Sequence, residues 1–148
     1  APLGADPLHA LVLDGFYDGA AFFRVVGGFV LQFGIAGTPA ENAKWSTPIQ
    51  DDPVVASNTQ FTVTYATAGP NTRTTQLFIN YKDNANLDAQ GFAPLGRVVA
   101  GKQYLSRVHD PTPGDSGGVN QTAYEAYGDA WIRTKYPEIN FIKKASIR

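Results

Sequence analysis

Residues Phe16 to Gly34 read FYDGAAFFRVVGGFVLQFG and carry the strongest β-sheet signal in the chain. Between Phe22 and Ile35 most residues are β-branched or aromatic, and two adjacent glycines, Gly27 and Gly28, interrupt them. Paired glycines within an apolar run predict two strands joined by a turn. Arg24 lies inside the first of these strands, although an always-charged guanidinium is rarely placed there without a partner or a ligand. The alternation of side chains leaves open whether Arg24 faces solvent or a binding site.

Further strands are predicted along the rest of the chain. Phe61 to Tyr65 alternates apolar and polar residues strictly, which is typical of a half-buried strand. Apolar and β-branched content predicts three more strands, at Gln76–Tyr81, Gly96–Val99 and Phe141–Ile147. Residues 36–58 and 110–120 hold prolines, glycines and aspartates with little periodicity, so they are predicted to be loops.

Two helices are predicted, one near each end of the chain. Asp6 is expected to cap the first helix with Pro7 at its first position, and Gly15 to end it in a left-handed conformation. Thr122 and Glu125 have the spacing of a capping box for a second helix that ends before the proline at position 137. Because helices never alternate with strands, the pattern predicts an antiparallel sheet or barrel with helices at its ends.

The composition is that of one ordinary domain, with 148 residues, 43% of them hydrophobic and 12% aromatic. Twelve basic residues balance thirteen acidic ones, which argues against a nucleic-acid partner. No run of about 18 apolar residues is present, so no membrane span is predicted. The chain has no cysteine, which excludes disulfides and thiol chemistry, and no methionine, which favours a processed exported or organellar form over a cytoplasmic one.

One motif points to a different chemistry. Gly114 to Gly118 reads GDSGG, which resembles the nucleophile loop of chymotrypsin-like serine proteases. A serine nucleophile needs an imidazole base, and the only histidines are His9, in the first predicted helix, and His109, seven residues before Ser116. The alternative, a Gly/Asp/Ser surface turn, is favoured over a protease.

Metal sites are not expected. Asp83 to Asp88 offers oxygen ligands but lacks the glycine and the terminal glutamate of a calcium loop, so a turn is favoured there. Asp51 and Asp52 are interpreted as a solvated pair in a loop. Two isolated histidines without cysteine make a poor zinc site.

Three segments resemble the signatures of the cyclophilins, which are peptidyl-prolyl cis-trans isomerases. They stand in the family's order and near its spacing, at Phe16–Gly34, Ala66–Ile79 and Leu87–Gly101. The ending Tyr136–Ala145 is similar to a cyclophilin subgroup with a long loop before the last helix. The resemblance covers nearly the whole chain.

The resemblance implies a mainly β fold, an eight-stranded antiparallel barrel capped by two helices. In cyclophilins a two-strand hairpin precedes the first helix, whereas this chain begins almost at that helix. We therefore expect a single domain over residues 1–148 that lacks the N-terminal hairpin, or receives it from another segment.

The resemblance also implies the site. Arg24 would stabilise the twisted amide, Gln32 would help to hold the substrate carbonyl, and no metal or cofactor would be needed. The remaining implied site residues are Phe29, Val30, Phe78 and Leu87 in a dry proline pocket, Ala66 and Thr67 pairing through their backbone with an extended substrate, and Gln76 lining the same groove.

Several positions depart from the family pattern. Val30 replaces a usual methionine, Thr67 a common asparagine and Gly27 a frequent proline. Asn86 stands where many members carry tryptophan, whose indole binds cyclosporin, and the family's pocket histidine has no counterpart, since Gly91 or Phe92 falls there. We expect retained but reduced isomerase activity on proline-containing segments and weak cyclosporin binding. The alternative is a catalytically weak cyclophilin-like module that binds such segments within a larger assembly.

Overall fold

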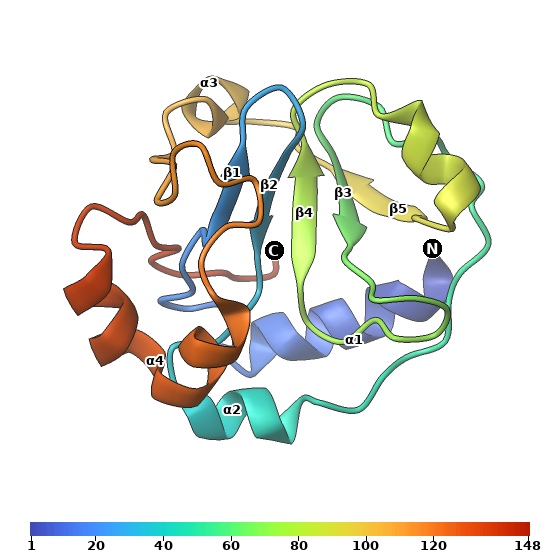
Figure 1. Ribbon diagram of the computed structural model, residues 1–148. Helices are drawn as coiled ribbons and strands as arrows, with labels where there is room; N and C mark the ends of the chain where they lie inside the picture. The colour runs from blue at the N-terminus through green and yellow to red at the C-terminus, as the bar shows by residue number, and fades with distance from the viewer.

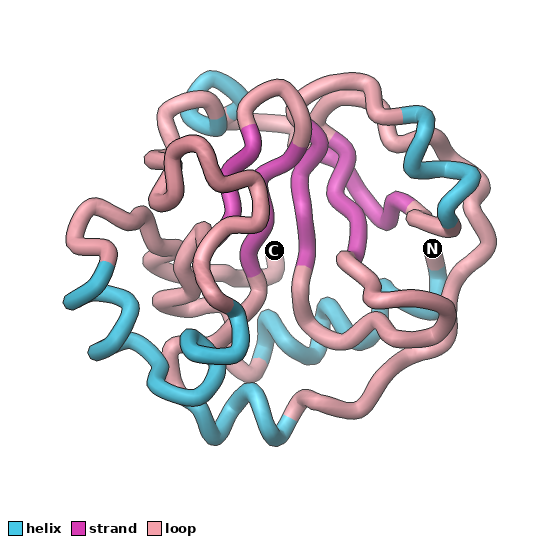
Figure 2. Tube along the Cα trace, viewed as in Figure 1, coloured by secondary structure: helices cyan, strands magenta, loops and turns pink.

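The computed structural model describes all residues from Ala1 to Arg148. Five strands form one antiparallel sheet in the order β1-β2-β4-β3-β5, with helices and loops around it (Figures 1 and 2). The strands are β1 (Arg24–Val26), β2 (Val30–Phe33), β3 (Thr62–Tyr65), β4 (Leu77–Asn80) and β5 (Pro94–Arg97). The helices are α1 (Pro2–Leu13), α2 (Pro39–Lys44), the 3-10 helix η1 (Ala85–Gln90), α3 (Lys102–Leu105) and α4 (Gln121–Lys135). The mainly β, antiparallel fold is thus confirmed, whereas β1 and β5 remain edge strands and barrel closure is not observed.

The central strands follow the prediction closely. β1 and β2 form the expected hairpin around the turn at Gly27–Gly28, which places Arg24 opposite Gln32. Gly28 has φ +69°, a left-handed conformation that glycine adopts without strain. The strands predicted at 61–65 and 76–81 are β3 and β4, while the one predicted at 96–99 begins two residues earlier, as β5.

The predicted strand at Phe141–Ile147 is wrong. Only Phe141 forms an isolated bridge, with Ala21. The Ile142 N–H donates to the Ala20 carbonyl at 2.9 Å and the Ile142 carbonyl accepts from Gly19 N–H at 2.7 Å, so the segment is bonded to the coil before β1. Apolar residues of this segment pack against the buried core and do not form a strand.

Helix α1 begins earlier than predicted because its cap comes from a distant residue. Asp6 and Pro7 both lie inside the helix, and the carboxylate of Asp52 accepts from the N–H groups of Leu3 at 2.8 Å and Gly4 at 2.9 Å. The Asp52 side chain is fully buried, and Nη1 of Arg73 donates to it at 3.1 Å. The interpretation of Asp52 as a solvated residue is therefore wrong, since it joins the start of α1 to a buried arginine.

Burial alone would raise the pKa of the Asp52 carboxyl. The hydrogen bonds from Leu3, Arg73 and Gly4, together with the charge of Arg73, outweigh burial and lower this pKa below its ordinary value. Asp52 is consequently held as a carboxylate that bonds both to a helix start and to a guanidinium.

Helix α4 is also capped differently from the prediction. Asn120 is the N-cap, and its side chain accepts from the Ala123 N–H at 3.0 Å, so the capping box of Thr122 and Glu125 is wrong. The helix bends at Gly128, whose φ of +69° is non-helical, and it ends before the proline at position 137 as expected. The short helices α2 and α3 were not predicted, and α2 lies in the segment expected to be a loop.

Two buried clusters make up the larger part of the core. One buried cluster packs residues just before β1 and just after β2 against α4 and consists of Ala21, Phe23, Ile35, Val119, Tyr124, Ile132 and Ile139. A second lies against α1 and consists of Leu11, Phe16, Tyr17, Ala36, Tyr65 and Leu77. In the view of Figure 1, α1 and α2 lie below the strands and α4 lies on the side of β1. No helix has the length and apolar content needed to cross a bilayer.

Candidate active site

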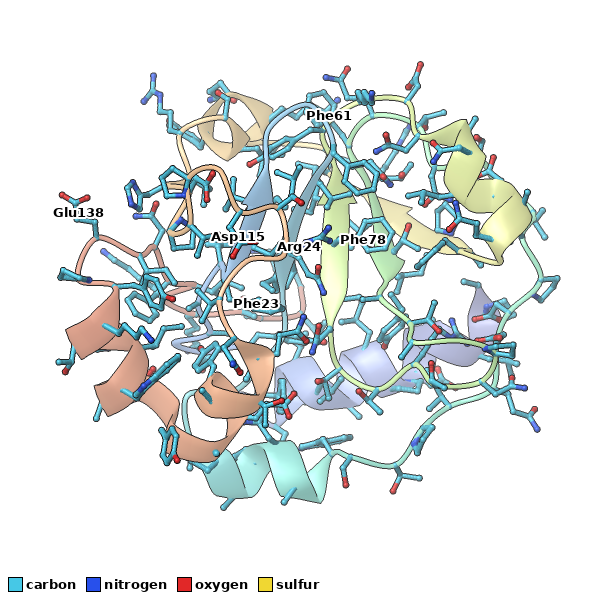
Figure 3. The ribbon with its side chains drawn as sticks, in the orientation of Figure 1. Phe23, Arg24, Phe61, Phe78, Asp115 and Glu138 are labelled. Atoms are coloured by element: carbon cyan, nitrogen blue, oxygen red, sulfur yellow. The ribbon has the colours of Figure 1, made fainter.

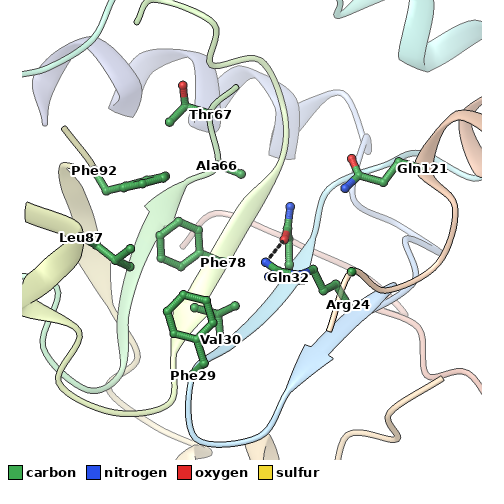
Figure 4. Close-up of a pocket in the computed structure, with 11 residues that line it drawn as sticks. Arg24, Phe29, Val30, Gln32, Ala66, Thr67, Phe78, Leu87, Phe92 and Gln121 are labelled. Carbon is green, nitrogen blue, oxygen red and sulfur yellow. Dashed lines mark hydrogen bonds between the residues drawn. The ribbon is translucent and has the colours of Figure 1, made fainter. Parts of the chain in front are cut away.

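A cavity of about 350 Å³ lies over β2 and β4 and extends to Arg24 on β1 (Figure 4). The residues that line it are Arg24, Phe29, Val30, Gln32, Ala66, Thr67, Phe78, Leu87, Phe92, Gly117 and Gln121. These include every site residue predicted from the sequence except Gln76. Gln76 lines an adjoining cavity of about 290 Å³, which shares Gln32, Ala66, Thr67 and Gln121 with the first.

The floor of the cavity is apolar because neighbouring strands point side chains to the same face. Phe78 on β4 lies beside β2, which contributes Val30, and η1 adds Leu87. Phe29 and Phe92 pack against these three, with the Phe92 ring edge-on to Phe78 at 5.6 Å between centroids. Such a surface favours an apolar ring over water.

Arg24 lies at the rim of this floor and is held by two hydrogen bonds. Its Nη1 donates to Oε1 of Gln32 at 3.0 Å, and its Nε donates to the Ser116 carbonyl at 2.7 Å. Its Cζ lies 6.0 Å from the centroid of the Phe29 ring. Burial lowers the pKa of Arg24 from its ordinary value, yet an arginine remains charged at neutral pH. The sequence left open whether Arg24 faces solvent or a binding site, and in the structure it faces the cavity.

Three glutamine amides extend from Arg24 across the site. Nε2 of Gln32 donates to Oε1 of Gln76 at 2.8 Å, and Nε2 of Gln76 donates to Oε1 of Gln121 at 2.9 Å. Since each amide donates to the next, the oxygen of Gln32 is turned toward Arg24. We call Gln32, Gln76 and Gln121 the amide row.

Thr67 presents its backbone to the cavity. Its hydroxyl is engaged within its own loop, by the Gly69 carbonyl and the Thr72 hydroxyl. Its main-chain N–H and carbonyl make no hydrogen bond within the protein. The neighbouring Ala66 N–H donates to the Gln76 carbonyl at 3.0 Å, so only its carbonyl is free, whereas both main-chain groups of Thr67 are free.

Sequence reasoning missed Phe92, Gly117 and Gln121 as site residues. Phe92 is one of two residues that fall at the position of a family histidine, and the left-handed Gly91, with φ +88°, ends η1 just before it. Gly117 and Gln121 come from a loop and a helix start nearly a hundred residues away from Arg24. No local pattern could have placed them there.

The GDSGG motif forms a turn and contacts Arg24. The Asp115 carboxylate accepts from the Gly117 N–H at 2.9 Å, which is typical of an Asx turn. His109 lies 3.6 Å from Glu138, and no histidine is hydrogen-bonded to Ser116. The serine protease chemistry therefore has no support in the geometry.

The Asp83–Asp88 segment is likewise used within the fold. The Asp88 carboxylate accepts from the Ser57 hydroxyl at 2.6 Å and from Asn58, and these hydrogen bonds lower its pKa. The segment lies at η1, where a turn was predicted.

Comparisons with known proteins identify one family. Residues 1–125 match the family described as cyclophilin type peptidyl-prolyl cis-trans isomerase. A peptidyl-prolyl cis-trans isomerase of Acinetobacter baylyi is 31% identical over 127 residues, covering 82% of this chain and 67% of that protein. One of Streptomyces antibioticus is 33% identical over 127 residues, covering 80% of this chain and 76% of that protein.

A solved structure shares the fold. It is a cyclophilin type peptidyl-prolyl cis-trans isomerase of Cryptosporidium parvum, crystallised in the presence of the dipeptide Ala-Pro. The TM-score is 0.68 at 21% identity, and the match covers 99% of this chain and 85% of that one. With the family match over most of its length, this chain belongs to the cyclophilin-type peptidyl-prolyl cis-trans isomerases.

Proposed function

We propose that this chain catalyses cis-trans rotation about Xaa-Pro bonds in protein segments, with Arg24 stabilising the twisted amide. One observation carries the proposal: a guanidinium is fixed beside the apolar floor of a cavity of about 350 Å³. Its Nη2 makes no hydrogen bond within the protein and is free to donate to a substrate.

The reaction needs electrostatic stabilisation more than a nucleophile. Rotation faces a barrier of about 18–20 kcal/mol because amide resonance must be broken. As the bond twists, the proline nitrogen becomes pyramidal and gains a lone pair. A donor fixed at that position binds the twisted amide more strongly than the planar one, and this difference lowers the barrier.

The other site residues seat the substrate. The proline ring occupies the floor formed by Val30, Phe78 and Leu87, which is almost fully buried. The free main-chain groups of Thr67 pair with the extended peptide, as backbone groups do between strands. Gln32 contributes to holding the substrate carbonyl, and its amide is oriented by its neighbours in the amide row.

An isomerisation assay tests the proposal. Exchange NMR on an Ala-Pro peptide measures the interconversion rate with wild-type protein, with the Arg24→Ala variant and with buffer alone. We expect acceleration by the wild type that is largely lost in the variant. Equal rates in all three samples would exclude the enzymatic function.

A second function is binding of proline-containing segments within a larger assembly, without useful catalysis. It is favoured by the unpaired edges of β1 and β5, because exposed sheet edges recruit further strands. In this proposal residues 1–148 form one domain, and strands from another segment or a partner complete the barrel. Binding of an Ala-Pro peptide with no acceleration of its isomerisation would identify this function.

We also propose that cyclosporin binds weakly because the indole donor of many relatives is absent. Asn86 is exposed on η1 beside the cavity residue Leu87, and its side chain makes no hydrogen bond. The Asn86→Trp variant should bind cyclosporin about fivefold more tightly, the value of one net hydrogen bond of about 1 kcal/mol. Isothermal titration calorimetry measures the Kd, with Asn86→Phe as the control that adds a ring but no donor. An equal increase in cyclosporin affinity in both variants would show that apolar contact, and not a hydrogen bond, causes the effect.

A further inference from the structure

The turn at residues 115–118 contacts Arg24 from the side away from the cavity floor. The Ser116 carbonyl accepts from Nε of Arg24 at 2.7 Å, the shorter of that side chain's two hydrogen bonds. In Figure 3, Asp115 and Phe78 lie on opposite sides of Arg24. The guanidinium is therefore bounded by this turn on one side and by Gln32 on another.

Gly118 sets how closely the turn approaches β1. Its φ is +76°, and a Cβ at this position would lie 2.7 Å from Cβ of Arg24 and 2.8 Å from the Phe23 carbonyl oxygen. The next residue, Val119, donates its N–H to the same Phe23 carbonyl at 2.9 Å. The turn is thus fastened to the backbone of Phe23, which directly precedes Arg24 at the start of β1, with no room for a side chain between them.

The turn is shaped by its own hydrogen bonds, independently of Arg24. The Asp115 carboxylate accepts from the Gly117 N–H at 2.9 Å, and the Asp115 N–H donates to the Thr112 carbonyl at 2.9 Å. The Gly118 N–H donates to the Asp115 carbonyl at 3.3 Å. These bonds leave the Ser116 carbonyl projecting from the turn as an acceptor.

We propose that the 115–118 turn is a positioning element for Arg24, an inference that rests on the proposed isomerase function. A guanidinium is planar, so hydrogen bonds at Nε and Nη1 together fix its plane and leave Nη2 as the donor for substrate. Gly118 and Asp115 are positioning residues, since neither touches the peptide bond that rotates. This role accounts for the GDSGG motif, because the carbonyl of its serine, and not the hydroxyl, acts on the site.

Two glycine variants isolate the effect. Gly118→Ala places a methyl group against Arg24, whereas Gly114→Ala, at φ +82°, places one in open space. Both residues adopt left-handed conformations, so both variants carry similar backbone strain. We expect Gly118→Ala to lower kcat about tenfold to a hundredfold with little change in KM, because a misplaced catalytic group weakens transition-state binding. Gly114→Ala should retain wild-type kcat, and equal kcat in the two variants would overturn the proposal.

A spectroscopic readout separates this inference from the isomerase proposal. The Nε–H proton of Arg24, assigned by its loss in Arg24→Lys, should exchange with water more slowly than that of Arg97, which is exposed on β5 and makes no hydrogen bond through its guanidinium. In Gly118→Ala the protection should disappear. Equal exchange of Arg24 and Arg97 in the wild type would overturn the positioning role, whether or not the protein isomerises peptides; protection without isomerisation would refute the isomerase proposal alone.

If Gly118→Ala does not fold, variants of Asp115 test whether the turn positions Arg24. Asp115→Ala removes the acceptor for the Gly117 N–H, while Asp115→Asn keeps an oxygen in the same place. We expect the alanine variant to lose both kcat and Nε–H protection, and the asparagine variant to recover both. Unchanged protection in Asp115→Ala would contradict the role of the turn.

Discussion

Replacing Arg24 with alanine lowers kcat/KM on an Ala-Pro peptide by about a hundredfold to a thousandfold, the loss typical of removing one preorganised donor from a site where charge develops. Arg24 is the only charged side chain that lines the cavity, and its Nη2 has no partner in the protein. No other lining residue can replace it as a cationic donor. The measurement is the rate of peptide isomerisation by exchange NMR, with thermal unfolding to show that the variant remains folded.

Arg24→Lys is the matched control for charge. Lysine keeps the positive charge but has no planar fork, so one ammonium cannot reproduce the bonds to Ser116 and Gln32 and also donate to substrate. We expect Arg24→Lys to lose most of the activity as well. Full activity in the lysine variant would show that charge alone is sufficient, and full activity in the alanine variant would remove Arg24 from the mechanism.

Replacing Asp52 with alanine lowers the free energy of unfolding by about 3–5 kcal/mol, the cost of breaking a buried ion pair by removing one partner. Arg73, whose side chain is 6% exposed, is left without its buried counter-ion. The N–H groups of Leu3 and Gly4 lose their acceptor at the start of α1. Urea unfolding at pH 7 measures the change.

The adjacent residue supplies the control. Asp51 lies 3.6 Å from Arg73 with its side chain about a third exposed, and its carboxylate accepts from the Asn71 N–H. Asp51→Ala should cost only about 1 kcal/mol, since a partly solvated interaction contributes little. A loss as large as that of Asp52→Ala would mean that the burial of Asp52 is not the source of its effect.

The contribution of Asp52 also depends on pH. Its pKa in the folded protein lies below the ordinary value of 3.8, so the unfolded chain binds this proton more readily. Its stabilisation is therefore fully present above pH 3.8 and is lost as the pH falls below that value through the lowered folded pKa. Urea unfolding at a series of acidic pH values should show the wild type and Asp52→Ala converging in stability.

The sheet could be predicted from the sequence where local pattern determines structure. The hairpin at Gly27–Gly28 and the strands β3 and β4 follow from alternation and glycine punctuation. The start of α1 could not be predicted, because its cap is Asp52, which is distant in sequence. The C-terminal segment was misread because apolar residues such as Phe141, which packs under Arg133 with 3.8 Å from Cζ to the ring centroid, resemble a strand when read alone.

The candidate site likewise combines residues that the sequence indicates with residues that only the fold brings together. The sequence drew attention to Arg24 because a charge interrupts an apolar strand, but its orientation depends on Gln32 and on the turn at 115–118. The amide row comes from three separate parts of the chain, and its last member, Gln121, lies 45 residues from Gln76. The resemblance to cyclophilins predicted the site residues near β2 and β4. The residues on the opposite wall could be assigned to the site only from the folded structure.

The amide row has a consequence for the chemical environment of the reaction. Glutamine side chains neither gain nor release protons in water, and no histidine, carboxylate or lysine lines the cavity. The one ionisable group, Arg24, keeps its charge far above neutrality. The charge that lines this cleft is therefore the same at all pH values near neutrality, so any dependence of the isomerisation rate on pH must come from groups outside the cavity.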